Sequence, residues 1–283
     1  MNHQLEKLFG LKFNPFTADV PLDALYISPR VENFLWRIEN ALVREGGFAM
    51  VHGLAGAGKS VVLRLLEKRL SRLSTAERQI AIINHPQSGV ADFYRELGDH
   101  FNIALRPANR WVSFKSLRER WLDHLSQSRR RSIVFIDEAQ ECSPAVLGEL
   151  RLMASHCFDS QMLLCVILAG DERLPEKLRR DDLVPLGTRI RVRLALEPAT
   201  PEELRACLDH LLETAGNTAL MTEELCKTLC DHSAGNPRAL MNTAGELLMM
   251  AARQELSQLD EKLYLQLTAS AQPAKRRGTK PAA

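Results

Sequence analysis

Eight consecutive residues have the composition and spacing of a loop that binds phosphate. They read Gly53-Leu54-Ala55-Gly56-Ala57-Gly58-Lys59-Ser60 and fit the pattern G-x-x-x-x-G-K-[ST]. In such a loop the glycines let backbone N–H groups turn toward a triphosphate, the lysine reaches the β- and γ-phosphates, and the serine hydroxyl is a ligand for Mg²⁺. We therefore predict that residues 53–61, which end with Val61 in the following helix, bind a nucleotide with Mg²⁺.

Two adjacent acids supply the second half of this chemistry. Asp137 and Glu138 follow the apolar run Ser132–Ile136, which has the length of a buried strand. At the end of such a strand an aspartate is placed to hold Mg²⁺, and the next acid is placed to polarise the water that attacks the γ-phosphate. The pair, read together with the loop upstream, indicates hydrolysis rather than binding alone.

Phosphoryl transfer also needs cations near the γ-phosphate. Arg189 precedes the apolar run Ile190–Leu196, and from there it could enter a neighbouring subunit's site as an arginine finger. Arg191 and Arg193 share its alternating face, so either could be the finger instead, or all could solvate an edge strand.

A further arginine stands at the start of a later helix. Pro237 and Arg238 follow Gly235-Asn236, and Pro is favoured at the first position of a helix. Arg238 could reach the phosphates from there, with Pro237 beside the nucleotide, or it could be a surface arginine.

The elements that must position these residues alternate between strand and helix through the first two-thirds of the chain. We predict strands at 48–52, 79–84, 132–136, 162–169 and 190–196, and helices at 61–73, 90–100, 113–128, 144–155 and 174–179. This alternation indicates an α/β fold, a three-layer sandwich with a parallel central sheet. After Pro198 the strand signals stop and helix starts follow at Thr200, Thr222 and Asn236, so a small all-helical lid domain is expected.

Together these features resemble an AAA+ ATPase. The opening Phe9-Gly10-Leu11-Lys12-Phe13-Asn14-Pro15-Phe16, followed by Tyr26-Ile27-Ser28-Pro29, is similar to the start of the secretion protein A (ExeA/GspA) group, which includes transposon ATPases of the TnsC/TniB kind. The resemblance covers about residues 5–255. It divides the chain into an N-terminal family segment with a first helix packed on the ATPase core (1–46), the ATPase domain (47–198), the lid (199–268) and a disordered basic tail (269–283).

The resemblance also implies roles for individual residues. It places Asn14, Pro15 and Phe16 near the adenine of ATP, although a rigid turn that packs Phe16 into the core explains the segment as well. Where the family commonly shows Gly-Gln-Pro-Glu-Leu, this chain has Gly170-Asp171-Glu172-Arg173-Leu174. Asp171 therefore stands at the sensor 1 position as an acid rather than an amide, which puts that role in question and implies slow hydrolysis.

Cations and aromatics gather after the second predicted strand. A net charge of +2 excludes a globally basic nucleic-acid coat, but a few cations repeated in each subunit of a ring or filament would follow a phosphate backbone without reading sequence. The candidates for duplex DNA contact are Arg106, Arg110, Lys115, Arg118 and Arg120. A solvated helix face explains them equally well.

Three functions follow from these expectations. The first is an ATP-dependent DNA-binding regulator of transposition, a homo-oligomer that assembles on duplex DNA and recruits a transposase or a target-selector protein. The alternatives are a secretion-pathway assembly ATPase and a non-catalytic nucleotide-switched adaptor. The chain opens without a basic and apolar leader, and its most apolar run, residues 162–169, is too short to span a bilayer, so we expect a cytoplasmic protein.

Overall fold

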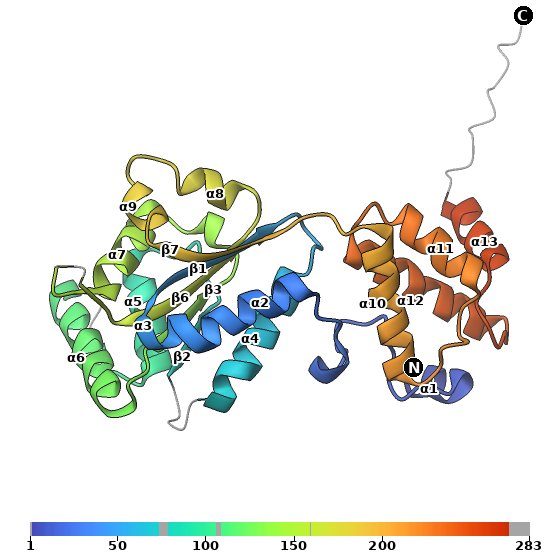
Figure 1. The fold of residues 1–283 in the computed structure, drawn as a ribbon, viewed down its shortest axis with the longest axis horizontal. Coiled ribbons are helices and arrows are strands. Elements are labelled where there is room, and N and C mark those ends of the chain that lie inside the picture. The colour runs from blue at the N-terminus through green and yellow to red at the C-terminus, as the bar shows by residue number, and fades with distance from the viewer. Residues whose placement is uncertain (1, 74–78, 106–108, 159, 272–283) are drawn as a thin grey trace, which may run out of the picture. The chain divides into compact units, whose positions relative to one another are not determined.

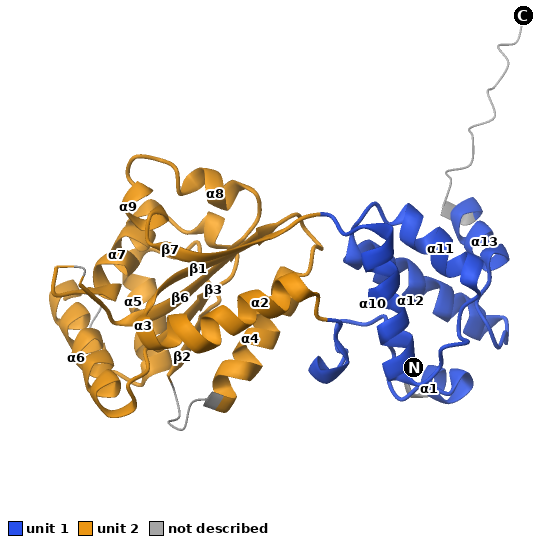
Figure 2. Cartoon of the chain, viewed as in Figure 1, with its two compact units in different colours: residues 1–26, 198–283 blue, residues 27–197 orange. Residues whose placement is uncertain are grey.

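The computed structural model describes residues 2–73, 79–105, 109–158 and 160–271. It consists of two compact units, which are coloured separately in Figure 2. Unit 2 is Ile27–Glu197, and unit 1 combines Met1–Tyr26 with Pro198–Ala283. The basic tail from residue 272 and Arg106 lie outside the described residues.

The centre of unit 2 is a five-stranded sheet in the order β2-β3-β6-β1-β7, in which every neighbouring pair is parallel (Figure 1). Its strands are β1 (Gly47–Gly53), β2 (Ile80–Ile83), β3 (Ser132–Ile136), β6 (Leu164–Gly170) and β7 (Ile190–Leu196). The predicted α/β fold with a parallel central sheet is confirmed. Because all strands run the same way, the segments that follow β1, β3 and β6 begin at one edge of the sheet.

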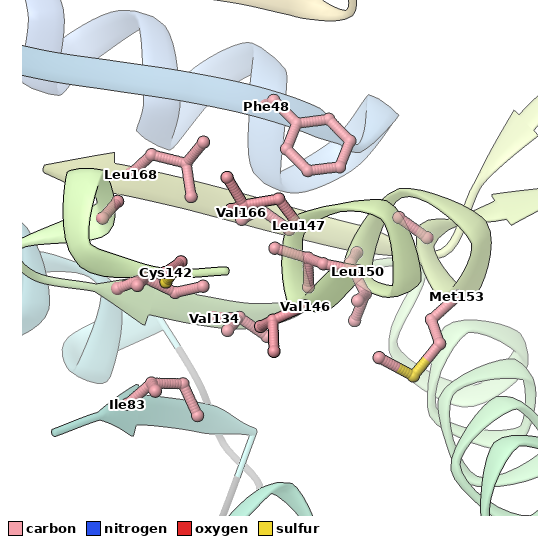
Figure 3. Close-up of a cluster of buried hydrophobic side chains, with 14 of the residues drawn as sticks. Phe48, Ile83, Val134, Cys142, Val146, Leu147, Leu150, Met153, Val166 and Leu168 are labelled. Carbon is pink, nitrogen blue, oxygen red and sulfur yellow. The ribbon is translucent and has the colours of Figure 1, made fainter. Parts of the chain in front are cut away.

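Helices cover both faces of the sheet, which explains why its central strands are apolar throughout. One face packs against α5 (Val90–Phe101), α6 (Arg110–Ser128) and α7 (Pro144–Ala154). Figure 3 shows Val146, Leu147 and Leu150 of α7 beside Val134 of β3 and Val166 of β6. On the other face lie α2 (Pro29–Arg37), the π-helical turn η2 (Ile38–Leu42), α3 (Val43–Glu45) and α4 (Lys59–Leu73).

Short elements connect these layers. They are the turn η3 (Ala139–Glu141), the hairpin strands β4 (Ser155–His156) and β5 (Gln161–Met162), α8 (Arg173–Lys177) and α9 (Val184–Gly187). The hairpin was not predicted, because its two-residue strands are too short to show an alternating pattern. It lies between α7 and β6 and shortens the predicted strand that began at Met162.

Arginines of α2 contact the free edge of the sheet. Arg30 donates to the carbonyl of Ala195, and Arg37 donates to the carbonyl of Arg191, each at 3.3 Å. An edge strand exposes carbonyls that could pair with another chain, and side-chain donors reduce that exposure. Two backbone carbonyls at the β7 edge thus have hydrogen-bond donors within unit 2.

Unit 1 is helical, as expected for the lid. After the 3-10 turn η1 (Leu22–Ala24), its helices are α10 (Pro201–Ala215), α11 (Glu223–His232), α12 (Pro237–Arg253) and α13 (Glu261–Ala271), with α1 (Asn2–Phe9) from the N-terminus. Thr200 and Glu203 form a reciprocal capping box, in which each side chain accepts from the other's backbone N–H. Such caps satisfy donors that the first turn leaves open.

The N-terminal segment is divided between the units, which corrects the expectation that residues 1–46 pack on the ATPase core. Residues 27–45 do belong to unit 2, but residues 1–26 belong to the helical unit. Leu5, Phe9 and Phe16 are buried there with the leucines of α10 and α12. The backbone N–H of Lys12 also donates to Ala215 at 2.8 Å. The turn that was expected to pack Phe16 into the core does so, but the core that receives it is that of the helical unit.

Among the helices that the structure describes, none combines the length and apolar character needed to cross a membrane.

Candidate nucleotide site

The phosphate-loop residues form the turn between β1 and α4. Gly56 and Gly58 have φ of +84° and +98°, a region that other residues adopt at a cost, so both glycines are required by the backbone path. Lys59 is the first residue of α4, and its ammonium donates to the carbonyls of Gly53 at 2.9 Å and Leu54 at 3.0 Å. The loop therefore holds a cation at the N-terminus of a helix, the place where protein backbones bind phosphate.

Gly53 has a different role from the other two glycines. A Cβ at this position would lie 2.4 Å from the carbonyl oxygen of Leu196 in β7. The glycine lets β7 approach the last residue of β1, so its requirement comes from the sheet. The motif attributes all its glycines to phosphate binding, and only the tertiary structure shows this second reason.

Asp137 and Glu138 follow β3 at the same edge of the sheet as the loop. Glu138 has φ of +50°, an unusual backbone conformation for a residue with a side chain, and the carboxylate of Asp137 accepts from its backbone N–H at 2.9 Å. Non-glycine residues in this region are strained and are concentrated at functional sites. Asp137 is half-buried and Glu138 is exposed, so both acids are accessible.

These residues fit ATP with Mg²⁺. The Ser60 hydroxyl and the Asp137 carboxylate are oxygen ligands of the kind that Mg²⁺ prefers, and Lys59 with the N-terminus of α4 provides positive charge for phosphate. When bound, Mg²⁺ would neutralise charge on the phosphates. Residues 53–61, which we predict to bind the nucleotide, run from the last residue of β1 into the first turn of α4.

His52 lies directly before the loop. Burial, and next the charge of Arg193, lower the pKa of this imidazole, while Glu172 opposes the shift. The ring is therefore neutral at pH 7 and leaves the charge of the loop to Lys59.

Gln140 links the end of β3 to the end of β6, and sequence reasoning missed it. Its side-chain amide donates to a carboxylate oxygen of Glu138 and accepts from the backbone N–H of Asp171 at 3.1 Å. Its position two residues after Glu138 is visible in the sequence, but its contact with β6 is not. Lys177 donates to its backbone carbonyl at 2.7 Å.

The carboxylate of Asp171 points toward Arg173. It accepts from the backbone N–H of Arg173 at 2.9 Å and from its guanidinium at 2.7 Å, and Arg173 also pairs with Glu141 at 2.6 Å. The backbone of Asp171 is thus at the expected edge, while its side chain is held in a local ion pair. Its sensor role stays a prediction.

The three finger candidates lie along the approach to β7. Arg189 donates to the carbonyl of Pro185, Arg191 pairs with Glu45 at 2.5 Å, and Arg193 donates to the carbonyl of Gly187 at 2.9 Å. Arg191 and Arg193 both point away from the core, in the alternating pattern of β7. All three thus have local partners, and which of them serves a neighbouring subunit stays a prediction.

Other predicted nucleotide residues lie in unit 1. Asn236 caps α12 by accepting from the backbone N–H groups of Arg238 and Ala239, Pro237 occupies the first turn, and the Arg238 side chain is exposed. Asn14 accepts from the N–H of Phe16 at 3.0 Å. The roles of Asn14, Pro15, Phe16, Pro237 and Arg238 toward the nucleotide stay predictions, and burial of Phe16 supports the packing explanation of its segment.

Two of the predicted DNA contacts have partners within unit 2, and their role toward DNA stays a prediction. Arg110 pairs with Glu149, a buried carboxylate that also accepts from the Tyr94 hydroxyl at 2.7 Å. The hydrogen bond to Glu149 raises the pKa of Arg110, and burial raises that of Tyr94. This network joins α5, α6 and α7.

Arg118 caps the C-terminal end of α7 by donating hydrogen bonds to its last carbonyls. Its guanidinium donates to the carbonyls of Met153 at 3.0 Å and Leu152 at 3.3 Å, contacts Ser155 and His156, and lies over the Phe114 ring. The last carbonyls of a helix have no partner within the helix, so a cation there is favourable. Lys115 and Arg120 are exposed, with Lys115 near Glu119 at 3.7 Å.

An open hollow of about 920 Å³ lies beside these arginines. Its lining includes Arg110, Trp111, Phe114, Arg118, Leu152 and Phe158, from α6, α7 and the hairpin. Trp111 is 71% exposed and stacks on Phe114, and Phe158 is fully exposed. This surface lies outside the candidate nucleotide site.

Comparisons with known proteins agree with the geometry. The AAA domain family matches residues 43–178, which include both the phosphate loop and the Asp137-Glu138 pair. The chain is 33% identical over 248 residues to general secretion pathway protein A of Aeromonas hydrophila; the match covers 87% of this chain and 44% of that protein. The chain thus spans less than half the length of this relative.

Similar solved structures show the same fold. They include Cdc6p from Pyrobaculum aerophilum (TM-score 0.66, 17% identity, 87% of this chain and 67% of that one). A second is the RuvB Holliday junction branch migration motor of Thermotoga maritima (TM-score 0.61, 15% identity, 91% of this chain and 72% of that one). A third is Drosophila ORC bound to DNA (TM-score 0.69, 15% identity, 94% of this chain and 65% of that one).

Proposed function

The chain is an AAA domain protein related to general secretion pathway protein A, and from this relationship we propose that it is an ATPase. The observation that carries the proposal is the meeting of two motifs at one sheet edge. The phosphate loop follows β1, the two acids follow β3, and both strands flank β6. Binding and hydrolytic groups separated by more than seventy positions are thereby brought to one site.

Each residue has a part in the proposed reaction. Lys59 and the N–H groups at the start of α4 hold the phosphates, while Ser60 and Asp137 hold Mg²⁺. Glu138 accepts a proton from the attacking water. Arg189 of a neighbouring subunit and Arg238 of unit 1 are proposed to add positive charge at the γ-phosphate, which requires a homo-oligomer, either a ring or a filament.

The relationship also bears on the process that this ATPase serves. It favours an assembly role in a secretion pathway over the transposition role that sequence analysis placed first, because the named relative belongs to a secretion pathway. The adaptor alternative is less favoured, since Glu138 and its hydrogen-bond partner are both present. The secretion role remains a proposal, because the chain corresponds to less than half of the relative.

Binding of duplex DNA is a second candidate function. The observation in its favour is the open hollow with exposed Trp111 and Phe158, whose lining also includes the cations Arg110, Arg118 and Arg151. A mobility-shift assay on duplex DNA with ATP, ADP or no nucleotide tests it. ATP-dependent retardation without sequence preference supports DNA binding, whereas no retardation under any condition excludes it and the proposed transposition role with it.

ATP turnover in Glu138→Gln tests the main proposal. A general base contributes about 10²- to 10⁴-fold, so we expect turnover to fall by about 10²-fold or more while ATP binding stays within about threefold. Phosphate release and fluorescent-nucleotide binding measure the two quantities. Glu119→Gln, an exposed change of the same type on α6, is the matched control. Absence of ATP binding, or normal turnover in Glu138→Gln, contradicts the proposal.

A further inference from the structure

We propose that Gln140 is a positioning residue that holds the Glu138 carboxylate and ties its position to the end of β6. The inference rests on the proposed ATPase function, which makes Glu138 the base. Gln140 lies in the turn η3 and is only 7% exposed. A buried amide needs hydrogen-bond partners, and the partners of this one are the base and the backbone of Asp171.

The orientation of the amide follows from its partners. Nε2 can only donate, and Glu138 presents the carboxylate oxygen Oε2 to it. Oε1 can only accept, and Asp171 presents its backbone N–H at 3.1 Å. Reversing the amide would set two acceptors against each other at Glu138 and two donors against each other at Asp171. A glutamine is therefore matched to both ends, whereas an acid or an apolar residue is not.

The contact at Glu138 has a chemical consequence. The residue is held at φ of +50°, a conformation that needs support from its surroundings. Gln140 binds one lone pair of Oε2, which fixes the carboxylate and leaves Oε1 and the second lone pair of Oε2 to accept a proton from water. The amide is neutral, so it orients the carboxylate through a hydrogen bond without placing a further charge beside it.

The contact at Asp171 depends on a glycine. A Cβ on Gly170 would lie 2.5 Å from Oε1 of Gln140 and within 3.0 Å of Leu174. Arg173 forms a second link between the same two segments, because its guanidinium donates to the carboxylates of both Asp171 and Glu141, the residue after Gln140. The end of β6 and the turn that follows Glu138 are thus joined by two routes, and a displacement of Asp171 would move the amide that holds the base.

Steady-state kinetics of Gln140→Ala and Gln140→Glu test the proposal. Loss of a residue that orients a reacting group typically costs about 10- to 100-fold, so we expect kcat of Gln140→Ala to fall by that factor, with KM for ATP within about threefold. In Gln140→Glu a second carboxylate beside Glu138 raises the pKa of the base, since like charges disfavour ionisation. The acid limb of its kcat–pH profile should therefore move to higher pH, an effect that general destabilisation does not produce.

Gln79→Ala is the matched control. Gln79 is also buried, and its side-chain oxygen accepts from the Ser132 hydroxyl at 2.8 Å, at the opposite end of β3. Its loss should lower thermal stability but leave kcat and the pH profile unchanged. If Gln140→Ala does not fold, the pH profile of Gln140→Glu decides.

The outcomes separate the two proposals. Wild-type protein without turnover overturns the proposed ATPase function, and the positioning role with it. Wild-type turnover that Gln140→Ala leaves unchanged, an unmoved acid limb in Gln140→Glu, or an equal loss of kcat in Gln79→Ala overturns the positioning role alone.

Discussion

Replacing Arg110 with methionine distinguishes a structural role of this residue from a role in DNA contact. The Arg110 side chain is 63% exposed, but its partner Glu149 is only 4% exposed and lies between α5, α6 and α7. Methionine keeps much of the aliphatic length of arginine and removes the charge. The change therefore leaves a buried carboxylate with the Tyr94 hydroxyl as its remaining partner in this network.

The expected loss of stability follows from this burial. A hydrogen bond to a charged group contributes about 1.5–3 kcal/mol, and breaking a fully buried ion pair costs about 3–5 kcal/mol. Because the guanidinium is largely exposed, water can replace it in part and the upper range does not apply. We expect a loss of about 2 kcal/mol, which in a domain of this size lowers Tm by about 4–8 °C.

Thermal unfolding followed by circular dichroism measures this loss. Arg110→Met, Glu149→Gln and the double variant form a cycle, and we expect the double variant to be less destabilised than the sum of the two single changes. Arg120→Met is the control, an exposed cation on the same helix whose loss should cost less than about 0.5 kcal/mol. If Arg110→Met keeps the wild-type Tm and weakens DNA binding instead, the structural role is refuted.

Two further changes test other parts of unit 2. Gly53→Ala places a Cβ 2.4 Å from the Leu196 carbonyl, so it should cost about 1–3 kcal/mol and weaken ATP binding, which thermal unfolding and nucleotide titration measure. Gly89→Ala is the control without a steric clash: a Cβ there meets nothing within 4 Å, so only a small loss from the N-cap of α5 and unchanged ATP binding are expected. Burial, and next the charge of Arg120, lower the pKa of His124, so the unfolded chain binds its proton more readily and stability should fall as the pH drops below 6.5. Urea unfolding at pH 7.5 and 5.5 should show a smaller fall in His124→Gln, and an identical fall contradicts the assignment.

Much of unit 2 could be predicted because its signals are local. Continuous apolar runs such as Ser132–Ile136 indicate strands buried on both faces, and the structure has the five strands close to their predicted positions. The parallel arrangement follows from the helices between the strands. Since parallel strands end at one edge, the meeting of the phosphate loop with Asp137 and Glu138 was also expected from sequence.

The placement of the N-terminal segment and the roles of single cations could not be predicted in this way. Leu5, Phe9 and Phe16 are apolar and would suit either core, and the leucines of α10 and α12 receive them. Arg110 and Arg118 have the composition of a nucleic-acid surface, yet both bond groups of α7. A charge pattern gives the number of cations, whereas their partners depend on elements distant in sequence.

The sequence by itself determined the parts from which we propose a nucleotide site: a phosphate-loop motif, a pair of acids after a buried strand, and an alternation that indicates a parallel sheet. These features depend on residues within a few positions of each other, where backbone geometry relates spacing directly to structure. The tertiary structure alone decided that Gln140 is hydrogen-bonded to both Glu138 and Asp171, and that the missing side chain of Gly53 lets β7 pack closely against the end of β1. Such contacts join residues tens or more than a hundred positions apart, and only packing of the sheet brings them within hydrogen-bond or van der Waals distance.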